Sequence, residues 1–185
     1  MDYELSNIES KAIFSNDKMK EYRYKLTRCW DRNKKQATFI MLNPSKATHL
    51  KFDNTIMNIH NFIIDYENES YGSYSVVNLF SYRSTDPKKI VNRDQKYEKN
   101  NEHYLIESFK SADIIVVAWG RDFSKVGAET KGHILKQIDK TLKLLNNYSE
   151  KVYVFWDGEE TKEDLKPRHP VFLKSNWTLI EYKFK

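Results

Sequence analysis

The sequence predicts a three-layer α/β sandwich, in which helices cover both faces of a central, largely parallel sheet. Apolar segments at residues 37–43, 74–80 and 112–119 alternate with stretches whose apolar residues have helical spacing. The 112–119 segment is continuous and β-branched, as expected for a parallel strand that is buried on both faces. Because 185 residues suffice for one core, we expect a single domain over residues 1–185.

Each further element has its own local signal. Polar and apolar residues alternate from Tyr22 to Trp30, which indicates a strand, and a turn signal at residues 31–35 predicts a hairpin over residues 22–42. Residues 1–20 have no clear period and are expected to form a short helix or an N-terminal arm. The remaining expected elements are helices near 55–67, 98–110 and 128–146, a strand at 151–156 and an edge strand from Trp177 to Tyr182. The expected core consists of Ile40, Leu42, Ile59, Phe62, Val77, Leu79, Ile115, Val117, Leu135, Ile138, Val152 and Val154.

Composition narrows the class of protein. No apolar run reaches membrane-spanning length and the N-terminus is polar and acidic, so we expect a cytoplasmic protein without a membrane partner. The single cysteine, Cys29, excludes an intramolecular disulfide and any four-cysteine metal or iron–sulfur site, and the histidines lack metal-ligand spacing. We expect no metal and no cofactor. A net charge of +5 with 14% aromatic residues suits a nucleic-acid partner.

The first candidate site lies where the segment 37–43 runs into Pro44 and Ser45. Pro44 cannot donate to a sheet ladder and holds Asn43 extended, and ligands of open α/β sheets bind where parallel strands end. The alternative is an ordinary turn, with Ser45 or Thr48 capping a following helix. Asp53 is either the N-cap of that helix or a carboxylate carried back over the site.

Two later strand exits also carry polar groups. Asn78 interrupts an apolar strand, and a buried Asn must satisfy several hydrogen-bonding groups, so it is a structural clamp or a ligand contact. Tyr82 and Arg83 follow that strand, and Arg83 suits anion capture. Arg121 occupies the corresponding place after the 112–119 strand.

The last candidate is the pair Arg168 and His169, which Pro167 and Pro170 flank. Proline on both sides holds the backbone extended and fixes a cation and an imidazole on one loop. The alternative interpretation is that His169 hydrogen-bonds a loop carbonyl while Arg168 is solvated.

The order of these motifs resembles a bacterial and phage domain family of unknown function, over about residues 22–175. The resemblance rests on Met41-Leu42-Asn43-Pro44-Ser45, Asp53-Asn54-Thr55-Ile56, Val77-Asn78-Leu79-Phe80-Ser81-Tyr82-Arg83, Ala118-Trp119-Gly120 and Pro167-Arg168-His169-Pro170. More remotely, the same order resembles the uracil-DNA glycosylase superfamily. That resemblance implies a glycosylase-like fold in which Asn43 positions water, Asn78 reads the base edge and His169 stabilises charge on the departing base.

The sequence also departs from those glycosylases. Met41 stands where they usually have Gly, Ser45 stands where they have Gly or Tyr, and Val171 stands where Ser often follows the His-Pro pair. An Asn at position 43 can orient water but cannot deprotonate it, so Asp53 is the candidate for that role.

Three functions remain as hypotheses. The first is a base-directed hydrolase that flips a nucleotide into a pocket between Asn43 and His169. The second is an inactive glycosylase-like module that binds nucleic acid or a nucleotide, and the third is a protein-interaction domain. For the first two, the expected partner is single-stranded DNA, distorted duplex DNA or a nucleotide. Arg83, Arg121 and Arg168 would then make salt-sensitive phosphate contacts, with Phe52, Tyr82 and Phe172 beside them.

Overall fold

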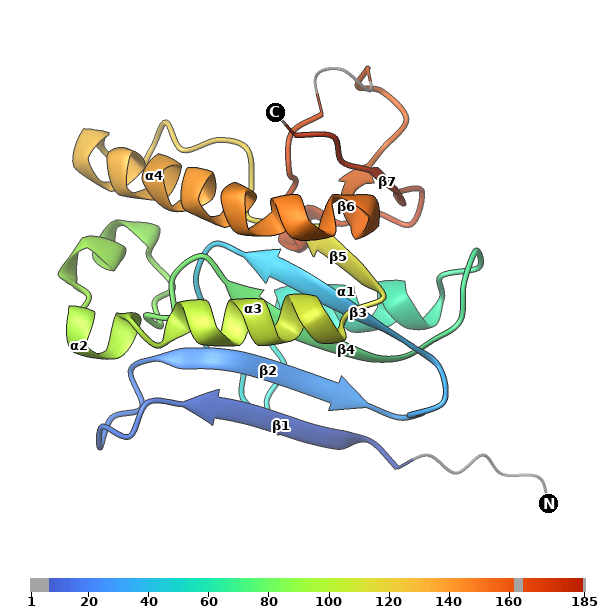
Figure 1. Ribbon diagram of the computed structural model, residues 1–185, viewed down its shortest axis with the longest axis horizontal. Helices are drawn as coiled ribbons and strands as arrows, with labels where there is room; N and C mark the ends of the chain where they lie inside the picture. The colour runs from blue at the N-terminus through green and yellow to red at the C-terminus, as the bar shows by residue number, and fades with distance from the viewer. Residues whose placement is uncertain (1–6, 162–164, 185) are drawn as a thin grey trace.

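The computed structural model describes residues 7–161 and 165–184. In these residues a seven-stranded sheet has the order β1-β2-β4-β3-β5-β6-β7 (Figure 1). The strands are β1 Glu9–Phe14, β2 Arg23–Cys29, β3 Lys35–Met41, β4 Tyr71–Asn78, β5 Ile114–Val117, β6 Val152–Trp156 and β7 Thr178–Glu181. The α-helices are α1 Asn54–Ile64, α2 Gln95–Glu98, α3 Asn101–Ser111 and α4 Ala128–Leu145, and the 3-10 helices are η1 Pro87–Asn92, η2 Asn146–Lys151 and η3 Pro170–Phe172. Over the same residues, no helix combines the length and hydrophobicity needed to cross a membrane.

The α/β class is confirmed, but the sheet is mixed. The central strands β4, β3, β5 and β6 are parallel, whereas β1 and β2 at one edge and β7 at the other pair antiparallel with their neighbours. The expectation of a largely parallel sheet therefore holds only for the centre. The four strands expected there and the final edge strand are confirmed, with ends shifted by a few residues.

The expected hairpin over residues 22–42 is wrong, because β4 lies between β2 and β3. The turn after β2 is attached to the start of β4: the backbone amides of Trp30 and Asp31 donate to the Gly72 carbonyl at 2.9 and 3.0 Å. A Cβ atom at Gly72 would lie 1.9 Å from the Asp31 carbonyl oxygen, so only glycine permits this approach.

The N-terminal expectation is also wrong over part of its length. Residues Glu9–Phe14 form β1, an edge strand paired with β2, rather than a helix or an arm. Both faces of this short strand mix polar and apolar residues, which concealed its period in the sequence. Residues 1–6 lie outside the described part of the chain.

Helices cover both faces of the sheet. Figure 1 shows α1 on one face and α3 and α4 on the other. Because side chains alternate along a strand, neighbouring residues of β4 enter different cores: Val76 packs with Ile59 of α1, and Val77 packs with Leu105 of α3. Nine of the expected core residues are buried, Phe62 and Ile138 are partly buried, and Leu135 is wrong, since it is 50% exposed on the outer face of α4.

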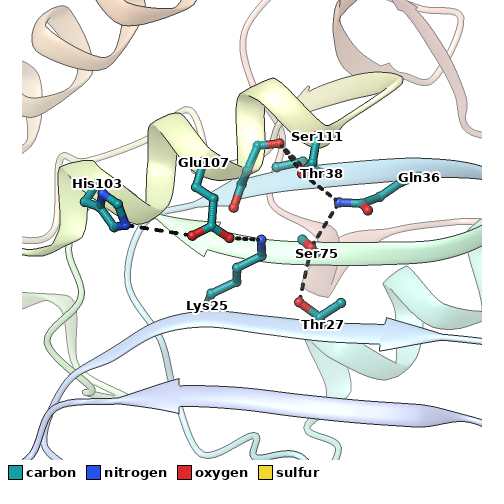
Figure 2. A network of polar contacts seen from close by, with 9 residues as sticks. Lys25, Thr27, Gln36, Thr38, Ser75, His103, Glu107 and Ser111 are labelled. Carbon is teal, nitrogen blue, oxygen red and sulfur yellow. Dashed lines mark hydrogen bonds and ion pairs between the residues drawn. The ribbon is translucent and has the colours of Figure 1, made fainter.

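Polar contacts attach α3 to the sheet (Figure 2). The Nζ atom of Lys25 donates to Glu107 Oε1 at 3.0 Å, and the amide of Gln36 donates to the hydroxyls of Ser75 and Ser111 at 3.3 and 3.2 Å. Gln36 is near the start of β3, so this network lies away from the carboxyl ends of the parallel strands.

Candidate functional site

A cleft of about 490 Å³ lies at the carboxyl ends of β3, β5 and β6. Leu42 follows β3, Trp119 and Gly120 follow β5, and Asp157 follows β6, so adjacent strands deliver these residues to one place. The apolar lining consists of Leu42, Pro87, Trp119, Phe123, Val126, Phe172 and Trp177. The charged lining consists of Arg121, Asp122, Asp157, Glu159, Arg168 and Lys174. The charged lining therefore contains three cations and three carboxylates.

Three of the predicted site residues line this cleft: Arg121, Arg168 and His169. The other six, which are Asn43, Ser45, Asp53, Asn78, Tyr82 and Arg83, are not among the residues that line it. The aromatic lining from Trp119 and Phe123 was not identified from sequence, because a Trp at a strand end looks like any core residue.

His169 is held in a fixed orientation at the cleft. Its Nδ1 accepts the backbone amide of Val171 at 3.2 Å, which makes His169 the N-cap of η3. Asn58 of α1 donates to the Pro170 carbonyl at 2.9 Å and ties the same segment to the helix. Gly120 passes close beside it, since a Cβ atom there would lie 3.8 Å from the His169 Cβ.

The environment keeps this imidazole neutral. Burial lowers the pKa of His169, and the Asp53 carboxylate opposes that shift only in part. Because Nδ1 already accepts a hydrogen bond, the neutral ring carries its proton on Nε2. His169 is therefore a hydrogen-bond donor at neutral pH. The alternative interpretation was a bond from His169 to a loop carbonyl, whereas the contact that the structure gives is Nδ1 accepting the Val171 amide.

Arg168 forms ion pairs within the protein and is not a solvated cation. Its guanidinium lies 2.6 Å from Asp157 Oδ2 and 3.2 Å from Glu160 Oε1, and it stands over the Trp177 ring at 5.0 Å. The side chains of Arg168 and Asp157 are only 11% and 10% exposed. Burial alone would raise the pKa of Asp157. The hydrogen bond from the Glu159 amide and the charge of Arg168 together outweigh burial, so the pKa of Asp157 is lowered.

Arg121 is also paired, because Glu160 accepts from its guanidinium. The 119–121 exit of β5, the loop after β6 and the Pro167–Pro170 segment are thus joined through two arginines and their carboxylates.

Asn43 joins two loops. Its side-chain amide donates to the Ser84 carbonyl at 2.8 Å, while the Ser84 amide donates to the Pro44 carbonyl at 2.8 Å. Two hydrogen bonds therefore hold the loops after β3 and β4 together. This contact uses the Asn43 amide as a structural donor.

Arg83 and Tyr82 also make contacts within the protein. Arg83 donates to the Lys20 carbonyl at 2.9 Å and to the Ser45 carbonyl at 3.4 Å, and burial lowers the pKa of its guanidinium. Tyr82 pairs with Tyr22 through a β-bridge and a ring contact of 5.4 Å.

A buried polar group that sequence reasoning missed lies on the α1 side of the sheet. Ile13 pairs with Lys25 and Phe14 with Arg23, so Tyr24 is the extra residue of a β-bulge in β2. Arg23 is 1% exposed and donates to the Ala47 carbonyl at 2.8 Å, which holds the loop after β3. Burial lowers the Arg23 pKa to about 10, opposed by the Asp53 carboxylate, so the group stays charged at neutral pH.

Asp53 and Asn78 belong to this same side. The N-cap interpretation of Asp53 is confirmed, since its Oδ1 accepts the Ile56 amide at 3.0 Å, and its charge also acts on His169. Asn78 is fully buried, yet among the described residues neither polar atom of its carboxamide has a hydrogen-bond partner. A buried unpaired amide is costly and uncommon, which is typical of a position kept for a purpose other than stability.

Within residues 7–161 and 165–184, no group of three or more His, Cys, Asp or Glu side chains has an arrangement that would hold a metal ion.

Comparison with known sequences gives a family. A family model described as a protein of unknown function, DUF1643, matches residues 23–171. The chain belongs to the DUF1643 family. The DUF1643 match runs from the start of β2 into η3, so it includes the loops after β3, β5 and β6 as well as His169. No curated protein and no solved structure matches the chain significantly.

Proposed function

We propose that the cleft binds a nucleobase, presented by a nucleotide or a DNA strand, and that His169 Nε2 donates a hydrogen bond to a carbonyl of the base. The neutral, fixed donor of His169 beside apolar and aromatic walls is the observation that carries this proposal. A planar heterocycle needs flat apolar walls and a few oriented polar groups, and a cleft of about 490 Å³ suits a ligand of that size.

Recognition would centre on the base rather than on phosphate. Charges of opposite sign balance inside the cleft, and Arg121 and Arg168 already pair with carboxylates. The formal charge of +5 still attracts a polyanion at long range. We therefore expect the affinity to fall with salt concentration less steeply than it would if each of these arginines were free to neutralise one phosphate.

Hydrolysis of an N-glycosidic bond is the second candidate, and the charge of Asp53 on His169 favours it. A donor at Nε2 would stabilise negative charge on a departing base. The Asn43 amide is committed to Ser84 and Asp157 is paired with Arg168, so activation of water would fall to another carboxylate. The candidates are Asp53, whose charge acts on His169, and Asp122 and Glu159, which line the cleft.

A binding and cleavage panel tests both candidates. The ligands are single- and double-stranded DNA, RNA and free nucleotides, each with normal and modified bases. Binding is followed by tryptophan fluorescence, because Trp119 and Trp177 line the cleft, and base release from the DNA substrates is followed by alkaline cleavage at the abasic site.

We expect at least one base class to bind, and His169→Phe, which keeps a flat ring but removes the N–H donor, to weaken binding about two- to tenfold through loss of one hydrogen bond. The matched control is His133→Phe, an exposed position on α4. Base release that requires His169 and one of the carboxylates Asp53, Asp122 and Glu159 would establish hydrolysis, and binding without release would identify a binding module. Folded protein that binds nothing in the panel would refute the proposal.

A further inference from the structure

A second hollow, of about 570 Å³, lies between the end of α1 and the segment 173–178. Residues 58, 61, 62 and 65 form one stripe of α1 and its C-cap along this hollow. Tyr66, Lys174 and Trp177 are also among the residues that line it. Trp177 and Lys174 line the main cleft as well, so the two hollows are neighbours.

Aromatic rings form a fixed wall of this hollow. The ring centroids of Phe62 and Tyr66 are 5.3 Å apart, with an angle of 38° between the rings. Phe155 packs edge-on against Phe62 at 5.2 Å, and Tyr71 lies 6.1 Å from Tyr66, so both rings are held from behind. Ring faces carry negative charge density and attract cations.

The electrostatics of the same hollow also favour a cation. Asp65 and Glu67 are exposed at its edge, and among the described residues neither carboxylate has an ion-pair partner. Helix α1 ends here with no basic residue in its last turn, so its carbonyl end adds partial negative charge. Lys174 is the one cation among the lining residues, which leaves the hollow acidic on a chain of net charge +5.

We infer that this hollow binds an organic ammonium ion: an alkylammonium group with its charge beside Asp65 and Glu67 and its methylenes against Phe62 and Tyr66. The acidic edge disfavours phosphate, and the aromatic wall favours an alkylated cation over a strongly hydrated metal ion. The ligand chemistry is shared by a free amine and by a lysine side chain. The inference does not depend on the proposed nucleobase site.

The test is an NMR titration of the ¹⁵N-labelled full chain with n-butylammonium chloride. We expect saturable amide shifts confined to residues 61–68 and 173–178. Sodium chloride at matched ionic strength and neutral 1-butanol are the ligand controls. Spermidine and N-acetyl-lysine methylamide distinguish the free amine from the lysine side chain, and the tighter of the two identifies the source.

Variants test separately how the carboxylates and the aromatic ring contribute to binding. The double variant D65N/E67Q should weaken binding at least about threefold, and Tyr66→Leu about two- to fivefold. The matched control E150Q/E181Q removes two exposed, unpaired carboxylates elsewhere in the described chain and should leave binding unchanged. Because Asp65 and Glu67 are exposed, their variants should keep the melting temperature of the wild type.

Three results would overturn the inference: no saturable shift with any ammonium ion, equal shifts with 1-butanol, or undiminished binding by D65N/E67Q.

Discussion

Replacing Arg168 with Ala should lower the stability of the protein as a whole. The guanidinium contacts Asp157 and Glu160, and the Arg168 and Asp157 side chains are 11% and 10% exposed. Removing one partner of a buried pair leaves the other charge uncompensated, which costs about 3 kcal/mol. For a chain of this length, each kcal/mol lowers the melting temperature by about 2–4 °C, so we expect a loss of about 6–12 °C.

Urea denaturation of wild type and R168A measures the difference directly. Arg121→Ala is the matched control, because Arg121 also pairs with Glu160 but is 46% exposed, and its loss should cost no more than about 1 kcal/mol. Adding Asp157→Asn to R168A removes the carboxylate that has lost its partner and should recover part of the lost stability.

The effect should depend on pH. The Asp157 pKa is lower in the folded chain than the unfolded value of about 3.9, so the ionised carboxylate stabilises the fold above that value. This stabilisation is lost as pH falls through the folded pKa, and the gap between wild type and R168A should narrow there. If the stability of R168A is within about 0.5 kcal/mol of wild type at neutral pH, or if R121A loses as much stability as R168A, the Arg168–Asp157 ion pair does not have this stabilising role.

Three further results are expected. Asn43→Ala should cost about 1 kcal/mol in urea denaturation, because it removes the hydrogen bond to Ser84, and unchanged stability would contradict that structural role. Gly72→Ala should unfold at a much lower urea concentration, since its Cβ would overlap the Asp31 carbonyl, and a normal midpoint would show that the turn can shift. The lowered pKa of His169 means that the unfolded chain takes up this proton first, so stability should fall as pH drops below about 6.5, and His169→Gln should flatten that slope.

The sequence predicted the centre of the fold well, because continuous β-branched segments and helical periods are local signals. β5 and α4 are examples. Strand order is not local: the position of β4 between β2 and β3 depends on a close approach at Gly72 that no pattern in residues 22–42 encodes.

Site residues were harder to predict for the same reason. His169 was found because two prolines mark a rigid loop. Arg168 was found as well, but its burial against Asp157 depends on which loops meet at the sheet edge. Arg23 was missed, since a β-bulge redirects it and a bulge leaves little trace in an alternating strand.

Imidazole ¹⁵N NMR can show whether His169 presents a neutral Nε2 donor to a base in the cleft. The measurement records the tautomer and charge of His169 at pH 7, and then follows its Nε2 resonance while free bases and nucleosides are added. We expect a neutral ring protonated on Nε2, and a saturable shift of that resonance with at least one base. A charged ring, a proton on Nδ1, or no shift with any base while the protein is folded would contradict the account.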